Sequence, residues 1–298
     1  MALIDICVPY WGDPRLMRET VESVLAQDSD QWTLTVLDDA YSDTSIGEWM
    51  ATLNHPRVRY LRNENNLGIV GNYQKMLTMV TQDLVMLLGC DDALLPNYVS
   101  TVLAAHQKHP TASIIHPGTK VIDENGREIR TLTDWAKTKL VMPKTEDFRL
   151  LEGESLAVSL LAGDWIYWPA LTFKTEKIKA YQFKPELKLT HDLAIVMDMV
   201  FGGETLLTDA TVCFAYRRHS KSASTASLID GRRFAEERKY FDMAVKLADR
   251  AGWLRAKRAA QWHITSRANA LWIAMNAFGK GKWAAVPALL GHVFNVSK

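Results

Sequence analysis

The sequence predicts an α/β protein with a mainly parallel central sheet flanked by helices and a helical C-terminal extension. Two observations give this prediction. Over the first 110 residues, short apolar runs alternate with stretches of helical spacing. From residue 230 onward, apolar residues recur every three or four positions without a further strand pattern. At 298 residues the chain is long enough for one large α/β domain plus an appendage, or for two domains.

Four apolar runs in the first half predict buried parallel strands, at residues 4–8, 32–37, 58–61 and 84–88. Helices are expected between and after them, at residues 16–27, from 45, at 71–80 and at 98–109. Asp13-Pro14 predicts an N-cap followed by Pro at the first helical position. Ser45 and Glu48 predict a capping box, and residues 65–68 predict a turn.

The second half continues the pattern less regularly. Strands are expected at residues 113–116 and 212–216, a hairpin-like turn at 123–126, and a short helix at 154–161. The polar stretch 131–149 predicts a long surface loop. We place a catalytic domain at residues 1–228, with halves at 1–117 and 118–228, and the helical extension at 229–298.

The formal net charge of +1 hides an asymmetry. Residues 1–214 carry 19 Lys or Arg against 29 Asp or Glu, a balance of −10, whereas residues 215–298 carry 16 against 5, a balance of +11. Cys7, Cys90 and Cys213 lie far apart in apolar runs, which favours reduced core cysteines in a cytosolic protein. We expect neither a secretory leader nor a membrane-spanning helix.

Chemistry-bearing side chains follow three of the predicted strands, in Pro9-Tyr10-Trp11, Asp38-Asp39 and Asp91-Asp92. Ligands of open α/β sheets bind beyond the carboxyl ends of the strands, so we expect these side chains at one crevice. An aromatic ring can stack on a base, and carboxylates can accept from a nucleoside or hold Mg²⁺ or Mn²⁺ against a diphosphate. The combination predicts a nucleoside diphosphate site. Each piece has a structural alternative, as a core aromatic, a turn former or a helix cap.

Dinucleotide-binding and ATP-loop proteins are disfavoured, because the sequence has neither G-x-G-x-x-G nor a Walker A segment. Four segments, in this order, resemble the motifs of family 2 glycosyltransferases with the GT-A fold. They are Pro9-Tyr10-Trp11, Leu37-Asp38-Asp39-Ala40-Tyr41-Ser42-Asp43, Asn66-Leu67-Gly68-Ile69-Val70-Gly71-Asn72 and Asp91-Asp92-Ala93-Leu94-Leu95-Pro96. The resemblance extends over roughly residues 3–225.

This resemblance implies that Trp11 flanks the base and Asp39 binds the nucleoside. It also implies that Asp91 and Asp92 hold the ribose and the metal-bound diphosphate. The further nucleotide-site candidates are Pro9, Asp38, Asn66, Gly68 and Asn72. The family's Asp-x-Asp-Asp motif begins here with Gly89, and we expect the two remaining carboxylates to suffice, since Mg²⁺ usually takes one or two.

The acceptor half carries an aromatic segment, in which Trp165 and Tyr167 are candidates for acceptor contact or for the core. Thr190 predicts a helix cap that places His191 and Asp192 in the first turn, where the helix dipole stabilises a carboxylate. The resemblance implies that Asp192 is the base that deprotonates the acceptor hydroxyl. His191 stands where Glu is common in the family and is a further acceptor candidate. The structural alternative for Asp192 is a surface cap.

Arg217-Arg218-His219-Ser220-Lys221 resembles the family's late Arg-x-His-Ser segment. The resemblance implies that His219 ligates the metal and that Arg217 and Lys221 bind the diphosphate. An ordinary solvated loop is the alternative. The tail that follows is basic, amphipathic and rich in Trp, which favours either contact with an anionic membrane surface or packing on the catalytic domain or a second subunit. Nucleic acid is not expected as a partner.

We therefore expect a metal-dependent, inverting glycosyltransferase with a UDP-, dTDP- or GDP-sugar donor and a glycan or lipid-linked glycan acceptor. The setting expected from the resemblance is the synthesis of bacterial surface polysaccharide such as O-antigen, in the cytoplasm or peripherally on the membrane. A nucleotidyltransferase is an alternative, but it should carry a Gly-rich basic loop after the first strand. An inactive nucleotide-sugar-binding subunit is another, suggested by Gly89 and His191.

Overall fold

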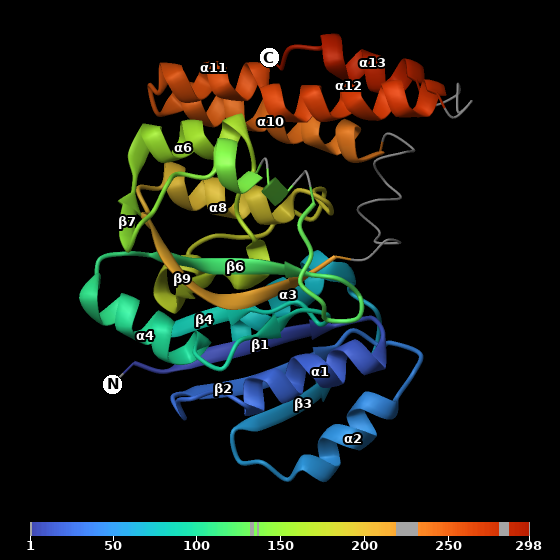
Figure 1. Ribbon diagram of the computed structural model, residues 1–298, viewed down its shortest axis with the longest axis vertical. Coiled ribbons are helices and arrows are strands. Elements are labelled where there is room, and N and C mark those ends of the chain that lie inside the picture. Colours follow the sequence, from blue (N-terminus) through green and yellow to red (C-terminus); the bar gives the residue numbers. More distant parts are fainter. Residues whose placement is uncertain (1, 132–133, 136, 219–231, 280–285, 298) are drawn as a thin grey trace.

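The computed structural model describes residues 2–131, 134–135, 137–218, 232–279 and 286–297. Within these ranges one mixed sheet of nine strands runs in the order β3-β2-β1-β4-β8-β6-β9-β5, with β7 paired to β9 (Figure 1). The strands are β1 (Ile4–Tyr10), β2 (Trp32–Asp38), β3 (Val58–Arg62), β4 (Leu84–Leu87), β5 (Ala93–Leu94), β6 (Ile114–Ile122), β7 (Phe148–Leu151), β8 (Thr172–Lys174) and β9 (Leu206–Arg217).

The first four strands are parallel, as the sequence predicts, with β1 between β2 and β4. Beyond β4 the sheet is mixed, because β8 runs antiparallel to both β4 and β6. Strands β5 and β7 are also antiparallel to β9, and only the β6–β9 pair is parallel in this half. The prediction of a mainly parallel sheet is correct for the first half and too simple for the second. An apolar run indicates that a strand is buried, but it does not indicate whether the neighbouring strand is parallel or antiparallel.

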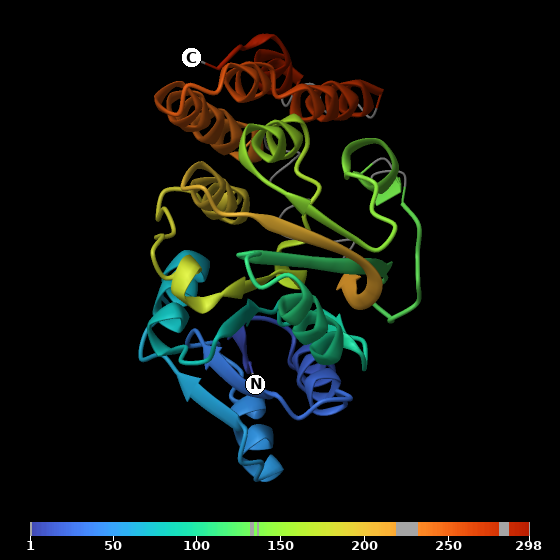
Figure 2. The same ribbon diagram turned by 90° about the vertical axis from the view of Figure 1, so that its left-hand side faces the viewer.

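Helices cover both faces of the sheet (Figures 1 and 2). Alternate side chains of β1, beginning with Ile4 and Ile6, pack with α1 (Pro14–Leu25), α2 (Ser45–Leu53) and α4 (Tyr98–Lys108). Cys7 points to the other face, where the core includes α3 (Gly68–Met79), α6 (Gly153–Ala162) and α8 (His191–Phe201). The short helices α7 (Thr175–Ile178), η1 (Lys137–Val141) and η2 (Trp168–Ala170) fill the connections.

The predicted helical tail is confirmed for the described residues. It consists of α10 (Arg232–Arg250), α11 (Leu254–Trp262), α12 (Ile264–Gly279) and α13 (Val286–Phe294). Helices α10 and α11 join the core formed with α6 and α8, whereas α12 and α13 pack in a small cluster with Phe234. The tail lies at one end of the molecule, opposite α2 and β3 (Figures 1 and 2). In the described part of the chain, no helix is both long and apolar enough to cross a membrane.

Several local predictions need correction. Ser45 is the first helical residue of α2 and does not cap it, and the Thr44 hydroxyl donates to Glu48 at 3.1 Å. Thr190 occupies the N-cap position of α8, but its hydroxyl donates to Glu236 of α10. The stretch 131–149, predicted as a loop, contains η1 and the start of β7. At the two helix starts, a carboxylate of a neighbouring residue (Asp43) or of a distant one (Glu236) replaces the predicted local hydrogen bond.

Candidate active site

Three strand ends meet at one edge of the sheet. Tyr10 of β1 is level with Asp38 of β2, and the backbone N–H of Asp39 donates to the Tyr10 carbonyl at 3.0 Å. On the other side of β1, the N–H of Leu88 donates to the carbonyl of Cys7 at 2.9 Å. The structure therefore brings the segments 9–11, 38–39 and 88–92 together.

Asp38 and Asp39 differ in what surrounds them. Asp38 is fully buried and accepts from the Tyr60 hydroxyl at 2.5 Å, from Arg62 at 2.5 Å and from a backbone N–H at 2.7 Å. These bonds hold the turn after β2. Asp39 uses a single oxygen, Oδ1, to accept from the Asn63 amide and from the backbone N–H of Leu67, both at 2.8 Å.

A set of amide side chains holds Asp39 in place. Asn63 donates to both Asp39 and Asn72, and Asn72 donates in turn to a β2 carbonyl at 3.0 Å. Lys75 donates to Asn63 at 2.7 Å. Asn72 is buried, so its placement is that of a positioning residue. The sequence analysis missed Asn63 and Lys75, and the Asn-rich turn at residues 63–66 is the signal that could have indicated the first.

The edge of the predicted nucleoside site is formed by exposed groups. The Trp11 side chain is 61% exposed and meets the Tyr41 ring edge-on, with centroids 5.5 Å apart. Pro9 is buried within β1. Gly68 has a φ of 72°, and its N–H donates to the Asn66 side chain at 2.9 Å, which forms the turn into α3. A Trp that the fold leaves exposed beside this crevice is available to stack on a planar ligand.

Asp91 and Asp92, the acidic pair, follow β4. Asp92 is buried and accepts from the backbone N–H of Arg217 at 2.8 Å through Oδ1. Its carbonyl accepts from the Thr20 hydroxyl of α1 at 2.7 Å. Burial, reinforced by the neighbouring charge of Asp91, raises the pKa of Asp92 well above its usual range. A buried carboxylate held beside a second one in this way is stabilised when a cation neutralises them.

Gly89 makes room for the acidic pair. A Cβ at this position would lie 2.5 Å from Oδ2 of Asp92 and 3.2 Å from Oδ1 of Asp91. Both carboxylates therefore approach one point that only a glycine leaves open. An Asp at position 89, as in the Asp-x-Asp-Asp pattern, would not fit beside Asp92 in this placement.

Arg217 was predicted to bind the diphosphate, and its placement speaks against that role. Its side chain is buried, with Nε donating to the Asp91 carbonyl and Nη2 to Glu19, both at 2.6 Å. The remaining Nη1 donates to the carbonyls of residues 123 and 124 at 3.3 and 3.4 Å. Because all three nitrogens donate within the protein, Arg217 positions the acidic pair. The predicted ligands His219 and Lys221 lie outside the described residues.

The candidate base, Asp192, lies in the first turn of α8 and is partly exposed. Burial raises the pKa of Tyr216, and the charges of the acidic pair and Asp192 raise it further. Burial likewise raises the pKa of Tyr73, again with contributions from Asp192 and Asp92. Asp92 and Asp192 therefore both act on the same two phenols, which come from α3 and β9.

His191 is also partly exposed, and its Nδ1 lies 3.0 Å from the Lys188 carbonyl. Its ring packs against Tyr73, Trp168 and Phe183 at centroid distances of 5.5, 6.3 and 6.3 Å. Trp168 donates to the Tyr73 hydroxyl at 3.2 Å, so these rings link α3 to the start of α8. His191 is thus placed to hold the position of Asp192.

The two aromatic acceptor candidates are core residues. Trp165 is fully buried, and its indole N–H donates to Ser159 at 2.9 Å. Tyr167 is buried, and its hydroxyl donates to Asp134 at 3.1 Å. The alternative of core packing is correct for both, since neither side chain reaches a surface where an acceptor could bind.

Asp164 and Lys137 were not predicted from the sequence. The Asp164 side chain is exposed, yet desolvation by surrounding protein raises its pKa to about 6, with Lys137 opposing and Asp192 reinforcing the shift. The Lys137 ammonium donates to the Ile166 carbonyl at 2.7 Å. No local sequence pattern marks these residues, because their neighbours come from distant parts of the chain.

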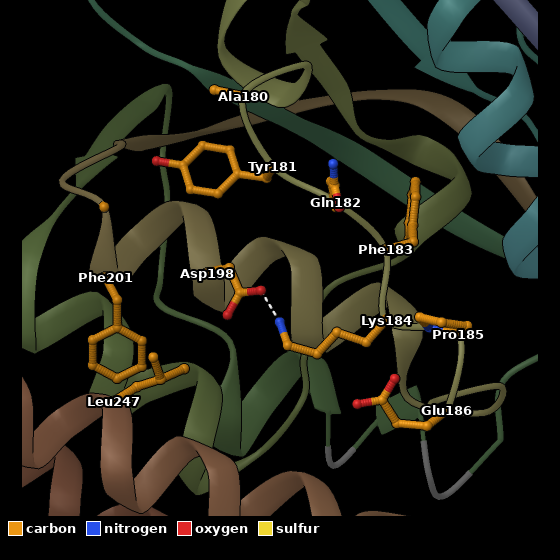
Figure 3. Close-up of a pocket in the computed structure, with 11 residues that line it drawn as sticks. Ala180, Tyr181, Gln182, Phe183, Lys184, Pro185, Glu186, Asp198, Phe201 and Leu247 are labelled. Atoms are coloured by element: carbon orange, nitrogen blue, oxygen red, sulfur yellow. Dashed lines mark hydrogen bonds and ion pairs between the residues drawn. The ribbon is translucent and has the colours of Figure 1, made fainter.

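In the described part of the chain, no group of three or more His, Cys, Asp or Glu side chains is arranged around a common metal position. A separate open pocket of about 630 Å³ lies on another side of α8, lined by residues 180–186 with Asp198, Phe201, Gly202 and Leu247 (Figure 3). Lys184 and Asp198 form an ion pair in it. This pocket contains none of the predicted donor or acceptor residues.

The model of glycosyl transferase family 2 matches residues 5–159, slightly more than half of the chain. The chain belongs to this family. It is therefore a glycosyltransferase. A putative colanic acid biosynthesis glycosyl transferase, WcaA of Escherichia coli, is 27% identical over 38% of this glycosyltransferase and 41% of WcaA. An uncharacterized Mycobacterium tuberculosis protein is 25% identical over 78% of the chain and 72% of that protein. The chain thus spans less than half of WcaA.

Solved structures share the GT-A fold of this glycosyltransferase. Staphylococcus aureus TarS, residues 1–349, superposes with a TM-score of 0.65 at 14% identity, over 98% of this chain and 81% of TarS. The mannosyltransferase PcManGT of Pyrobaculum calidifontis, in complex with GDP-Man and Mn²⁺, superposes with a TM-score of 0.62 at 15% identity. That match covers 98% of this chain and 86% of PcManGT. At these identities the comparison establishes the fold.

Proposed function

We propose that this glycosyltransferase is metal-dependent and inverting, and transfers a sugar from a nucleoside diphosphate to a hydroxyl of a glycan acceptor. Residues 1–228 form the catalytic domain in this proposal, and residues 229–298 the extension. The observation that carries it is that Asp39 and the acidic pair follow the two strands that flank β1, at one edge of the sheet. Asp92 of that pair and Asp192 of α8 both raise the pKa of Tyr73 and of Tyr216.

On the donor side, Asp39 binds the nucleoside. Its Oδ1 is held by Asn63 and the backbone N–H of Leu67. Among the described residues no hydrogen bond is directed to Oδ2, which leaves that oxygen to accept from a base N–H or a ribose hydroxyl. Trp11 supplies a stacking surface, and Asp91 lies toward the ribose. UDP-GlcNAc in TarS and GDP-Man in PcManGT support a nucleoside diphosphate sugar as donor.

The acidic pair fits a divalent cation. Two carboxylate oxygens approach the same point beside Gly89, and burial with the charge of Asp91 raises the pKa of Asp92 despite the opposing effect of Arg217. Carboxylate oxygens are the ligands that Mg²⁺ and Mn²⁺ prefer. Bound there, such a cation would offset the charge of the diphosphate leaving group. The Mn²⁺ in PcManGT supports this assignment.

On the acceptor side, Asp192 takes the proton of the attacking hydroxyl. The acceptor oxygen forms a bond to the anomeric carbon as the bond from that carbon to the diphosphate oxygen breaks. The electron pair leaves with the nucleoside diphosphate, and attack from the opposite face inverts the configuration. Asp164, whose pKa responds to the charges of Lys137 and Asp192, can bond to sugar hydroxyls on the acceptor side. We propose a lipid-linked glycan of surface polysaccharide synthesis as acceptor, supported by the name of WcaA.

Two measurements test this function. The first is the melting temperature of the protein with UDP, GDP, dTDP and CDP, each with and without Mn²⁺. One nucleotide should raise the melting temperature, and more so with Mn²⁺, because ligands that bind only the native state stabilise it. The second is release of that nucleotide from its sugar donors. If no nucleotide shifts the melting temperature in Mn²⁺, the donor site is wrong; binding without any turnover would indicate a binding subunit.

A further inference from the structure

The last 48 residues have a charge composition unlike the rest of the chain. Residues 251–298 contain seven Lys or Arg and no Asp or Glu. On α11, Arg255 and Arg258 are exposed, and neither has an ion pair among the described residues. Residues 1–214 have a balance of −10, so the positive charge is concentrated at the end of the molecule that carries the tail helices (Figure 1).

The same region has an exposed apolar face. Leu271, Trp272, Met275 and Phe278 of α12 are 42%, 61%, 61% and 55% exposed. With Ile264, which is 68% exposed, they lie on one side of the helix, since Ile264, Leu271, Met275 and Phe278 follow one another at steps of seven, four and three residues and Trp272 is three residues before Met275. We call these five residues the α12 face. The opposite side of the helix is buried through alanines, which include Ala270 and Ala274 and pack with Leu289 of α13.

Arg255, Arg258 and Trp262 are three, four and seven residues apart and share one side of α11, which leads into the α12 face. Helix α11 ends at Trp262, which is 52% exposed, and the guanidinium of Arg267 lies 5.3 Å from the centre of its ring. One residue after Trp262, the chain enters α12, where Ile264 begins the α12 face. Exposed Trp, aliphatic and Phe side chains with flanking Arg are the composition of helices that lie in the headgroup region of a bilayer.

We propose that the α12 face, with Arg255 and Arg258, docks this enzyme onto an anionic lipid surface. This surface goes beyond the proposed transfer reaction and is testable without it. The charge of this surface favours a lipid bilayer over a second copy of the chain as its binding partner. A two-fold contact through the α12 face would bring the same cations of both copies together, whereas anionic headgroups complement them. A contact with the acidic half of another copy would be head-to-tail and would not close into a dimer.

The test is sedimentation of the full chain with vesicles of phosphatidylcholine, with and without phosphatidylglycerol. Binding should require phosphatidylglycerol and weaken as salt is raised, because the exposed charges are screened. Arg255→Ser and Arg258→Ser should each weaken binding about fivefold, as expected for loss of one cation near an anionic surface. Arg59→Ser, which removes an exposed arginine of β3 at the other end of the molecule, is the control and should leave binding unchanged.

The apolar side chains of the α12 face are tested by a separate pair of variants, one in the face and one control. Leu271→Ser combined with Met275→Ser should weaken vesicle binding about tenfold or more, since buried methylene groups are lost from the interface. Leu150→Ser removes a β7 side chain with the same 42% exposure as Leu271 and should have no effect. Trp fluorescence of the full chain should shift to shorter wavelength with anionic vesicles, and Trp272→Ser should reduce that shift.

Three results would overturn the proposal. One is no sedimentation with phosphatidylglycerol vesicles, and another is sedimentation that the Leu271 and Met275 substitutions leave intact. The third is a lipid-free dimer, seen by analytical ultracentrifugation, that Trp272→Ser dissociates; this would make the α12 face a subunit interface. Nucleotide binding by the same samples is measured separately, so failure of membrane docking and failure of the donor site are distinguishable.

Discussion

Gly89→Ala is the substitution that most directly probes the acidic pair. Gly89 does not have a left-handed φ, so alanine is compatible with the backbone at this position. Its methyl group, however, would lie 2.5 Å from Oδ2 of Asp92, closer than real Cβ atoms come to other heavy atoms. Asp92 is buried and its other oxygen accepts from the Arg217 N–H, so the carboxylate has to rotate and lose that hydrogen bond.

The expected cost follows from that one bond. A backbone N–H left unpaired in a buried site costs about 1–3 kcal/mol. The free energy of unfolding should fall by about this amount, without metal or nucleotide. If the displaced carboxylate also binds the cation more weakly by about 1–3 kcal/mol, the affinity for UDP or GDP in Mn²⁺ should weaken about 5- to 150-fold, because each 1.4 kcal/mol is tenfold.

Gly12→Ala is the matched control, because its Cβ would lie 3.4 Å from the Cys90 sulfur, an ordinary contact in the same region. Urea unfolding gives the stability, and titration of nucleotide with and without Mn²⁺ gives the affinity. The role of Gly89 is refuted if Gly89→Ala and Gly12→Ala both keep the wild-type free energy of unfolding and the wild-type affinity for nucleotide in Mn²⁺. The convergence of the two carboxylates at Gly89 would then not matter for the site.

Further predictions concern the remaining carboxylates. Asp192→Asn should lower kcat of transfer about 10²- to 10⁴-fold with unchanged donor affinity. The control on the same helix, Asp198→Asn, breaks the ion pair with Lys184 and should lower the free energy of unfolding instead. Asp39→Asn should weaken nucleotide binding with little loss of stability. Asp38→Asn should lower the melting temperature, because it removes the carboxylate that pairs with Arg62. If Asp38→Asn and Asp39→Asn weaken nucleotide binding equally, the different roles assigned to the two residues are wrong. In the metal-free protein the raised pKa of Asp92 makes the folded state bind its proton more tightly, so this group's contribution to stability falls as pH rises above 3.8. Mn²⁺ affinity should rise over the same range with release of a proton, and a pH-independent affinity would show that Asp92 is not a ligand.

Much of the fold was predictable from the sequence because it depends on local pattern. The parallel strands β1, β2 and β4 and the helices between them follow from apolar runs and helical spacing. The meeting of Asp39 with the acidic pair was also predictable, since parallel strands place their carboxyl ends at one edge. Side-chain assignments were less successful. By sequence, Trp165 and Tyr167 fit either acceptor contact or the core, and tertiary packing buries both.

The sequence by itself determined the order of the elements, the sheet edge where Asp39 and the acidic pair lie and the basic character of the tail. These follow from periodicity, strand direction and composition, which act over short distances. Only the tertiary structure decided that Asp38 is enclosed by Tyr60 and Arg62 while Asp39 is held through one oxygen by Asn63 and Leu67, and that Arg217 supports the acidic pair. Such roles depend on which distant group occupies each hydrogen-bonding position, and a buried polar group is governed by that partner rather than by its neighbours in the chain.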